Sequence, residues 1–281
     1  MTAVTFVINA VGGVANNSAY SFIVHCETLP FHILKIVGEP THLLCARREQ
    51  LYIMAIFVIG DLHLSFGCDK PMDIFKGWEG YQEKLYDNWH RLISEDDTVV
   101  LAGDTSWGMS LADAVPDFKW LDALSGKKLI LKGNHDYWWS SAAAIRRCFN
   151  ENGITTLDII HNNSYLVEGV NICGSRGWLF ETGQAHDEKI IRREAGRIEA
   201  SLKAADDNAK SILFLHYPPA YKEQEMPAFL ELMRSYGISR CYYGHIHGAG
   251  HRFAIDGVYK GIDLRLISGD YIDFCPVKVE I

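Results

Sequence analysis

The sequence contains no closely spaced pair of cysteines. Seven cysteines are scattered through its 281 residues, and none of them belongs to a C-x-x-C pattern. Because their number is odd and their spacing irregular, we expect neither a disulfide framework nor a cysteine-based zinc site. We interpret them as reduced thiols of a cytoplasmic protein, most of them packed as small apolar side chains.

The sequence also lacks a long hydrophobic run. No stretch reaches the roughly 18 uninterrupted apolar residues that suggest a membrane-spanning helix. The apolar N-terminus has no basic region, since the first lysine is Lys35, and this disfavours a secretory signal peptide. We therefore expect no membrane association and a cytoplasmic location.

Positive charge is scarce as well. The chain carries 27 Lys and Arg against 35 Asp and Glu, a net charge of −8, with no extended basic tract. A protein that binds nucleic acid mainly through the phosphates of the strand is usually more basic. The remaining composition, 48% apolar and 22% charged, is typical of a globular protein, and an acidic balance suits a site that collects cations.

The first 53 residues differ from the rest of the chain. Only six of residues 1–53 are charged, against 56 of the other 228, and no helical or strand period persists among them. Met54 then opens the apolar stretch "MAIFVIGD", residues 54–61. We expect residues 1–53 to be a non-native extension, with Met54 as the physiological start and 54–281 as the functional domain. The alternative is a genuine extension that packs on this domain.

From residue 54 onward, apolar runs alternate with helix-compatible stretches. Strands are expected at 55–59, 98–102, 128–131, 165–173, 211–215, 238–243, 264–268 and 277–281. Helices are expected at 79–94, 111–124, 138–149 and 186–207. Strand–helix alternation followed by a strand-rich second half predicts an α/β domain with more than one sheet layer.

Five of the expected strands run straight into Asp, Asn or His. The residues at these five points are Asp61 and His63; Asp104; Asn134 and His135; His216; and His245 and His247. Four of the five points have a glycine directly before the first polar residue, and glycine permits a sharp turn and a close approach of the backbone. Because sites in open α/β sheets form at the carboxyl ends of strands, we expect these side chains to converge.

The residue types in this set indicate metal binding. Carboxylate and amide oxygens together with imidazole nitrogens suit Mn²⁺, which is our first choice, and also Fe or Zn²⁺. The set is too large for one tetrahedral ion and fits two ions that share a carboxylate and a water. In the D-x-H and H-x-H spacings, residues i and i+2 of an extended chain would point to the same side.

The ordered set D-x-H, G-D, G-N-H-D, H and G-H-x-H resembles that of the calcineurin-like metallophosphoesterase superfamily, in a bacterial subgroup. The resemblance covers residues 54–281. It implies an α/β fold in which two mixed sheets form a four-layer α/β/β/α sandwich flanked by helices. The sequence departs from many members at the fourth block, where Leu215 rather than glycine precedes the histidine.

The resemblance also implies a role for each residue. It assigns Asp61, His63 and His247 to a first metal ion, Asp104 to both ions, and Asn134, His216 and His245 to the second. His135 would protonate the leaving oxygen or stabilise charge on the phosphoryl group, and Asp136 would orient a neighbour. The implied reaction is hydrolysis of a phosphomonoester or phosphodiester by a hydroxide that bridges the ions.

Several interpretations stay open outside these blocks. Arg176 follows an expected strand and can clamp a substrate phosphate through its guanidinium. Trp107 is a candidate pocket wall and His251 a candidate residue of the outer site, whereas the remaining histidines are expected to be structural or solvated.

The expected substrates are small phosphorylated molecules. The segment "GDTSWGMS", residues 103–110, lacks the additional Asp and Arg that protein phosphatases of the superfamily carry there. One alternative is a nuclease that acts on nucleic-acid ends with a partner subunit supplying positive charge. The other is a non-catalytic scaffold of the same fold, which would be expected to lack ligands.

Overall fold

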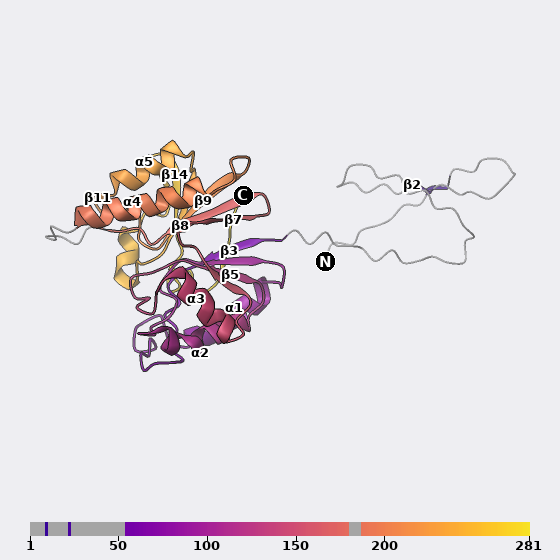
Figure 1. Cartoon of the computed structure of the whole chain (residues 1–281). Coiled ribbons are helices and arrows are strands. Elements are labelled where there is room, and N and C mark those ends of the chain that lie inside the picture. The colour runs from indigo at the N-terminus through magenta and orange to yellow at the C-terminus, as the bar shows by residue number, and fades with distance from the viewer. Residues whose placement is uncertain (1–8, 11–21, 24–53, 180–186) are drawn as a thin grey trace. The chain divides into compact units, whose positions relative to one another are not determined.

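The computed structural model describes residues 9–10, 22–23, 54–179 and 187–281 (Figure 1). The chain separates into two units, Met1–Tyr52 and Ile53–Ile281. In the first unit, two short strands pair antiparallel: β1 (Asn9–Ala10) and β2 (Phe22–Ile23). The histidines that lie outside the described residues are His25, His32, His42 and His186. A physiological start at Met54 stays a prediction.

The first sheet of the second unit is built largely from the predicted apolar runs. Its order is β15-β3-β4-β5-β6. Its strands are β3 (Ile56–Ile59), β4 (Thr98–Leu101), β5 (Lys127–Ile130), β6 (Leu157–Ile159) and β15 (Val277–Lys278). Strands β3 to β6 are parallel, and β15 is antiparallel at one edge. The carboxyl ends of β3, β4 and β5 therefore meet at the same end of the sheet.

The second sheet has the order β13-β14-β12-β9-β8-β7. Its strands are β7 (Ser164–Val167), β8 (Val170–Ser175), β9 (Lys210–Leu215), β12 (Arg240–Tyr243), β13 (Gly257–Tyr259) and β14 (Ile262–Leu266). The four inner strands are parallel, and β7 and β13 are antiparallel at the edges. A separate pair consists of β10 (Ala220–Tyr221) and β11 (Gln224–Glu225). Both large sheets are mixed.

Helices cover the outer faces of the two sheets (Figure 1). On the first sheet lie α1 (Tyr81–Leu92), α2 (Leu111–Asp122) and α3 (Ala142–Glu151). On the second lie α4 (Asp187–Lys203) and α5 (Pro227–Ser235), and a 3₁₀ helix, η1 (Gly248–Phe253), follows β12. The predicted sandwich of two sheets flanked by helices is confirmed. Among the described helices, none has the length and apolar character needed to cross a membrane.

The core is divided into layers because successive side chains of a strand point to opposite faces. Ile59 of β3 faces the helices of the first sheet and belongs to one buried cluster with Trp89 of α1. Val58 points the other way and belongs to a cluster between the sheets that includes Phe214 of β9. A third cluster joins the second sheet to α4 and α5. The two sheets are thus packed face to face, which brings their strand ends into one region.

Two of the predicted elements that are wrong in extent have a clear physical reason. The run 165–173 is a hairpin rather than one strand, because β7 and β8 are joined by a turn at Glu168 and Gly169 with left-handed backbone (φ 50° and 74°). The helix expected at 138–149 begins only after Ser141, whose hydroxyl accepts a hydrogen bond from the N–H of the third helical residue. The apolar pattern also does not predict β6, β13 or α5, which are too short to show a clear period.

Asp117 of α2 is a buried carboxylate that ties the helix to the loop after β4. It accepts hydrogen bonds from the hydroxyl of Ser106 and from the backbone N–H of Phe66 (2.7 Å). Burial raises the pKa of Asp117 from 3.8 to about 6. The folded protein therefore holds this proton more tightly than the unfolded chain does. The contribution of Asp117 to the free energy of unfolding is complete below about pH 4 and is lost as the pH rises through about 6.

In the wild type, the free energy of unfolding should fall between about pH 4 and pH 7.5 as Asp117 ionises. We predict that this fall is smaller by about 2–3 kcal/mol in Asp117→Asn, because roughly two pKa units correspond to that free energy. Urea unfolding at the two pH values measures this difference. Asp87→Asn, at an exposed position of α1, is the control and should behave as the wild type. Identical pH dependence in wild type and Asp117→Asn would contradict the raised pKa.

Candidate metal centre

The candidate metal-binding residues follow the carboxyl ends of parallel strands in both sheets. In the first sheet, Asp61 follows β3, Asp104 follows β4 and Asn134 follows β5. In the second, His216 follows β9 and His245 follows β12. The backbone N–H of His245 donates to the carboxylate of Asp61 (2.9 Å), so the two sheets are joined at this point. The fold therefore places residues from five strand ends in one region.

Two glycines let the backbone approach the carboxylates closely. A Cβ atom at Gly133 would overlap the Oδ1 atom of Asp104, and a Cβ atom at Gly244 would overlap the Oδ2 atom of Asp61. Any other residue at either position would have to displace a carboxylate. Glycine fits at these two positions because it has no Cβ atom to clash with the neighbouring carboxylate.

Four of the seven candidate ligands have a left-handed backbone. The φ angle is 58° at Asp61, 45° at His63, 50° at Asp104 and 73° at His245. Residues with a Cβ atom seldom adopt this conformation, which costs on the order of 1–3 kcal/mol each. The extended-chain explanation of the D-x-H spacing is therefore wrong. Sharp turns after β3, and not an extended strand, direct Asp61 and His63 into the site.

The first group of donor atoms consists of Asp61, His63 and His247. Their nearest ligand atoms all lie within 4.8 Å of one another. The Nε2 atom of His247 is 3.6 Å from Oδ1 of Asp61, and Nε2 of His63 is 3.7 Å from Oδ2 of Asp104. The donor atoms of this group are close enough together to hold one ion, with Asp104 adjoining them.

Asn134 connects the remaining histidines. Its Oδ1 atom lies 2.6 Å from Nε2 of His216 and 2.9 Å from Nδ1 of His245. The Nδ1 atom of His216 donates to the carbonyl of Ala102 (3.1 Å), so its Nε2 atom carries a lone pair. That Nε2 atom is also 3.5 Å from Oδ2 of Asp104. Lone pairs directed at one another in this way suit a shared cation.

The two carboxylates of the centre are buried close together. The nearest ligand atoms of Asp61, Asp104 and His216 lie within 4.8 Å of one another, and each carboxylate is at most 1% exposed. Burial and the charge of Asp61 raise the pKa of Asp104 well above its ordinary value. Burial acts in the same direction on Asp61, but His247 and the other imidazoles outweigh it and lower the pKa of Asp61. Both carboxylates can be ionised together only with positive charge beside them.

Three imidazoles of the centre are held neutral. Burial lowers the pKa of His63, His216 and His245, and that of His245 falls to about 3. Neutral imidazole is the form that binds metal. The Nδ1 atom of His63 is buried and has no hydrogen-bond partner among the described residues. This donor set therefore fits divalent cations.

Asp270 is a supporting residue that the sequence analysis missed. Its Oδ1 atom lies 2.8 Å from Nδ1 of His247, and its Oδ2 atom is 3.3 Å from Nε2 of His251. Burial would lower the pKa of His247, but Asp61 and Asp270 raise it to about 10. A carboxylate on the far nitrogen orients a metal-binding imidazole. The signal is present in the sequence, since Asp270 follows an apolar strand and a glycine as Asp61 does.

His135 lies beside the centre and belongs to neither group of donor atoms. Its backbone N–H donates to Oδ1 of Asp104 (2.7 Å), and its Nδ1 atom is 3.3 Å from the hydroxyl of Tyr137. Its ring is 4.5 Å from that of Trp107, which in turn stacks on His63 at 4.9 Å. Trp107 is therefore a wall of the site, and the half-buried imidazole of His135 is held at the edge.

The carboxylate of Asp136 is buried and joins two loops. It accepts hydrogen bonds from the backbone N–H groups of Asp104 (2.9 Å), Thr105 (2.9 Å), Ser106 (3.3 Å) and Gly133 (2.7 Å) and from the indole of Trp138 (2.9 Å). These bonds fix the loop after β4 against the loop after β5. Asp136 thereby sets the position of Asp104 relative to Asn134, an environment that suits an orienting role.

The backbone of Arg176 contacts that of the candidate ligand His216. Its carbonyl accepts hydrogen bonds from the backbone N–H groups of His216 (3.2 Å) and Tyr217 (2.8 Å). Its guanidinium is 3.4 Å from Glu194 and lies over the ring of Trp178 at 4.9 Å. The side chain lines a cavity whose walls include none of the candidate metal ligands.

The other described residues singled out by sequence are peripheral. His90 is exposed on α1, where its Nδ1 atom is 2.9 Å from the carbonyl of Tyr86, as expected of a solvated residue. His161 lines the same cavity as Arg176. The five cysteines within the described residues are free.

We predict that Gly244→Ala disrupts the centre without unfolding the protein, because the added Cβ displaces the carboxylate of Asp61. Metal analysis of the purified variant should give half or less of the wild-type metal content. The matched control is Gly196→Ala in α4, where a Cβ meets nothing within 4 Å. It should retain the metal and stabilise the helix by about 0.5–1 kcal/mol. Wild-type metal content in a folded Gly244→Ala variant would contradict the geometry.

Solved structures that are similar to this chain include three proteins. The protein of unknown function AQ665 of Aquifex aeolicus is 15% identical, with a TM-score of 0.43, and the match covers 80% of this chain and 95% of that chain. Phosphopantetheinyl hydrolase of Mycobacterium tuberculosis is 14% identical, with a TM-score of 0.49 and coverage of 80% and 95%. TT1561 of Thermus thermophilus is 13% identical, with a TM-score of 0.45 and coverage of 69% and 83%. A search of curated proteins finds no match to the sequence.

A family model gives the more specific result. The model described as calcineurin-like phosphoesterase matches residues 54–249, which is more than half of the chain. The match spans the strand ends that carry Asp61, Asp104, Asn134, His216 and His245. The chain belongs to the calcineurin-like phosphoesterase family.

Proposed function

We propose that this protein hydrolyses small phosphate esters at a centre for two divalent cations. The observation that carries the proposal is the buried pair Asp61 and Asp104, surrounded by the amide of Asn134 and the neutral imidazoles of the centre, which are those of His63, His216 and His245. Such a set has more ligand atoms than one tetrahedral ion uses. Asp61, His63 and His247 would hold one ion, Asn134, His216 and His245 the other, and Asp104 both. Mn²⁺ is the first choice, and Fe or Zn²⁺ suit the same donors.

The protein's own residues would do the positioning. When bound, two such cations supply an acidified water as the nucleophile and neutralise the phosphate oxygens. The carboxylate of Asp136 accepts hydrogen bonds from five N–H groups and thereby fixes the loops that carry Asp104 and Asn134. Asp270 fixes the ring of His247. The ligands are therefore held in place before substrate binds, which lowers the cost of reorganisation during the reaction.

His135 is the proposed general acid. Its backbone bond to Asp104 holds it at the edge of the centre, and packing against Trp107 limits the rotation of its ring. From this position the imidazole can donate a proton to the leaving oxygen or stabilise charge on the phosphoryl group. Tyr137 contacts its far nitrogen and would assist its orientation.

An apolar pocket beside the centre supports a small-molecule substrate. A cavity of about 370 Å³ is lined by Met72, Phe75, Trp78 and Trp107 and reaches His247. Pockets of this size and character hold the non-reacting part of small ligands.

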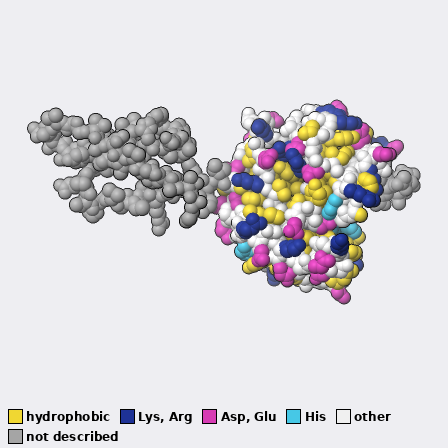
Figure 2. Space-filling model, turned by 180° about the vertical axis from the view of Figure 1, so that it is seen from behind, with side chains coloured by type: hydrophobic (Ala, Val, Ile, Leu, Met, Phe, Trp, Pro, Cys, Tyr) yellow, Lys and Arg dark blue, Asp and Glu magenta, His cyan; other side chains and the backbone are white. Residues whose placement is uncertain are grey.

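The alternative of a nuclease requires a basic surface. On the face shown in Figure 2, acidic and basic side chains are interspersed and do not form a basic stripe. A nuclease would therefore need a partner subunit to bind the phosphates of a long strand. The scaffold alternative expects missing ligands, whereas all seven candidate ligands are present in the sequence.

The experiment that tests the function compares two chromogenic esters. Wild-type protein and Asp104→Asn are assayed with Mn²⁺ on p-nitrophenyl phosphate and bis-p-nitrophenyl phosphate. Turnover by the wild type that disappears in Asp104→Asn supports the proposal, and the preferred ester distinguishes a monoesterase from a diesterase. No metal and no turnover on either ester would favour the scaffold.

We predict that His135→Ala keeps its metal but loses turnover by a factor of about 10²–10⁴, the usual contribution of a general acid. The measurement is kcat on the preferred chromogenic ester together with metal content. His90→Ala, at an exposed position of α1, should match the wild type in both. Full turnover by a metal-replete His135→Ala variant would refute the role of His135.

A further inference from the structure

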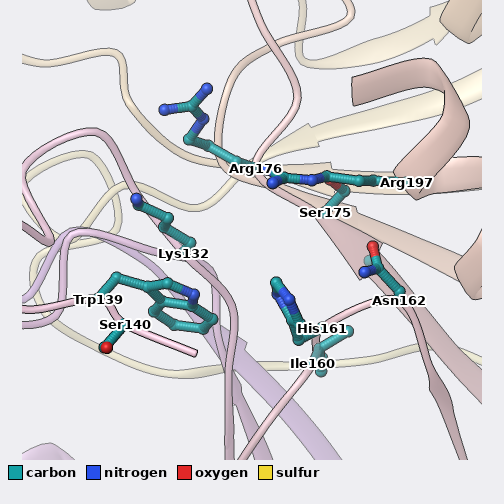
Figure 3. A pocket seen from close by; sticks show the side chains of 10 residues that line it. Lys132, Trp139, Ser140, Ile160, His161, Asn162, Ser175, Arg176 and Arg197 are labelled. Atoms are coloured by element: carbon teal, nitrogen blue, oxygen red, sulfur yellow. The ribbon is translucent and has the colours of Figure 1, made fainter. Parts of the chain in front are cut away.

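A second cavity, of about 140 Å³, lies at the carboxyl ends of β5, β6 and β8 (Figure 3). Lys132 follows β5, His161 and Asn162 follow β6, Arg176 follows β8, and Arg197 projects from α4. In Figure 3, Lys132 lies on one side of this pocket and Asn162 and Arg197 lie on the other. The pocket is built from both sheets and a helix, so it depends on the tertiary fold.

The pocket is a direct neighbour of the metal centre. Lys132 is two residues before Asn134 in the same loop. Arg176 accepts a hydrogen bond through its carbonyl from the N–H of His216 (3.2 Å), and adjacent strands are only about 4.8 Å apart. None of the residues lining the pocket is a candidate metal ligand. A group bound here would therefore lie beside a phosphate at the centre and be distinct from it.

The pocket carries more positive charge than its acidic partner neutralises. The guanidinium groups of Arg176 and Arg197 share one oxygen of Glu194, at 3.4 and 2.9 Å, and Glu194 is fully buried. Lys132, the third cation, has no ion pair among the described residues. Three cations thus line a pocket with one carboxylate behind them. Positive charge that no carboxylate of the pocket neutralises therefore remains available to a bound anion.

Hydrogen-bond donors and size also favour a phosphate group. The Nε atom of Arg176 is buried and has no hydrogen-bond partner among the described residues. The cavity is several times the roughly 30 Å³ that a water occupies. It has room for a phosphate group, and guanidinium and ammonium groups are the usual donors to phosphate.

We propose that this pocket binds a second phosphate group of the substrate, one that is not hydrolysed. The natural substrate would then be a small molecule with two phosphate groups, one at the metal centre and one between Lys132, Arg176 and Arg197. This inference rests on the proposed phosphoesterase activity. It gives Arg176 a role in selecting the substrate and not in the chemical step.

The test compares bisphosphates with matched monophosphates on the manganese-bound full-length protein. To keep the esters intact, every protein in this comparison carries His135→Ala, and calorimetry measures the binding of fructose 1,6-bisphosphate against fructose 6-phosphate, and of adenosine 3′,5′-bisphosphate against adenosine 5′-monophosphate. We expect the protein with the wild-type pocket to bind at least one bisphosphate tenfold or more tightly than its monophosphate. Arg197→Gln should reduce that ratio about tenfold, because it removes one donor and one positive charge.

The controls separate a binding role from a structural one. Arg192→Gln removes an exposed arginine of the same helix, paired only with Glu188 among the described residues, and should keep the wild-type ratio. Because Arg197 also supports Glu194, Lys132→Gln is the second variant. It breaks no ion pair of the described residues and should likewise lower the ratio.

The outcomes distinguish this inference from the function on which it rests. Equal binding of both bisphosphates and their monophosphates, or a preference that survives Arg197→Gln and Lys132→Gln, would overturn the second phosphate site. Ester turnover without such a preference would leave the phosphoesterase in place and remove only this pocket. A preference lost in both variants, without turnover of any ester, would retain the pocket as an anion site and overturn the phosphoesterase.

Discussion

The mutual repulsion of two buried carboxylates is the constraint on which the site depends. Asp61 and Asp104 come from neighbouring strands and are taken almost entirely out of water. Burying one unpaired carboxylate is costly, and burying two side by side is more so. The fold nevertheless supports this arrangement with bare glycine backbone and left-handed turns. Bound cations would offset the repulsion between the two carboxylates, so this arrangement suits a cation-binding site.

The rest of the molecule serves to hold that pair in position. Parallel strands in both sheets end at the same level, and the layer of apolar side chains between the sheets keeps those ends together. Asp136 locks the loops that carry Asp104 and Asn134, and Asp270 locks His247. The acidic centre and the cationic pocket at Arg176 and Lys132 carry charge of opposite sign, and Lys132 is two residues from Asn134 in the same loop. A substrate with two phosphate groups matches that distribution.

Much of this arrangement follows from the sequence, because its signals are local. Apolar runs followed by Gly-Asp or Gly-His predict both the strands and the positions of Asp61, Asp104 and His245, and the family resemblance that these blocks carry implies the sandwich fold. Asp270 also follows an apolar strand and a glycine, but it does not belong to a D-x-H or H-x-H pattern, so sequence reasoning misses it. The start of α3 was placed too early because a hydroxyl cap at Ser141 outweighs the apolar pattern before it. The left-handed turns and the contribution of Arg197 to a pocket depend on tertiary packing, which spacing along the chain does not express.

The most direct test of the account is to locate the metal ions. Crystals of the full-length protein grown with Mn²⁺ would be measured at the manganese absorption edge, and an anomalous difference map calculated. A centre for two cations predicts two peaks, one on each side of the Asp104 carboxylate, the first also in contact with His63 and the second with Asn134. A single peak, or peaks away from Asp104, would contradict a centre for two cations.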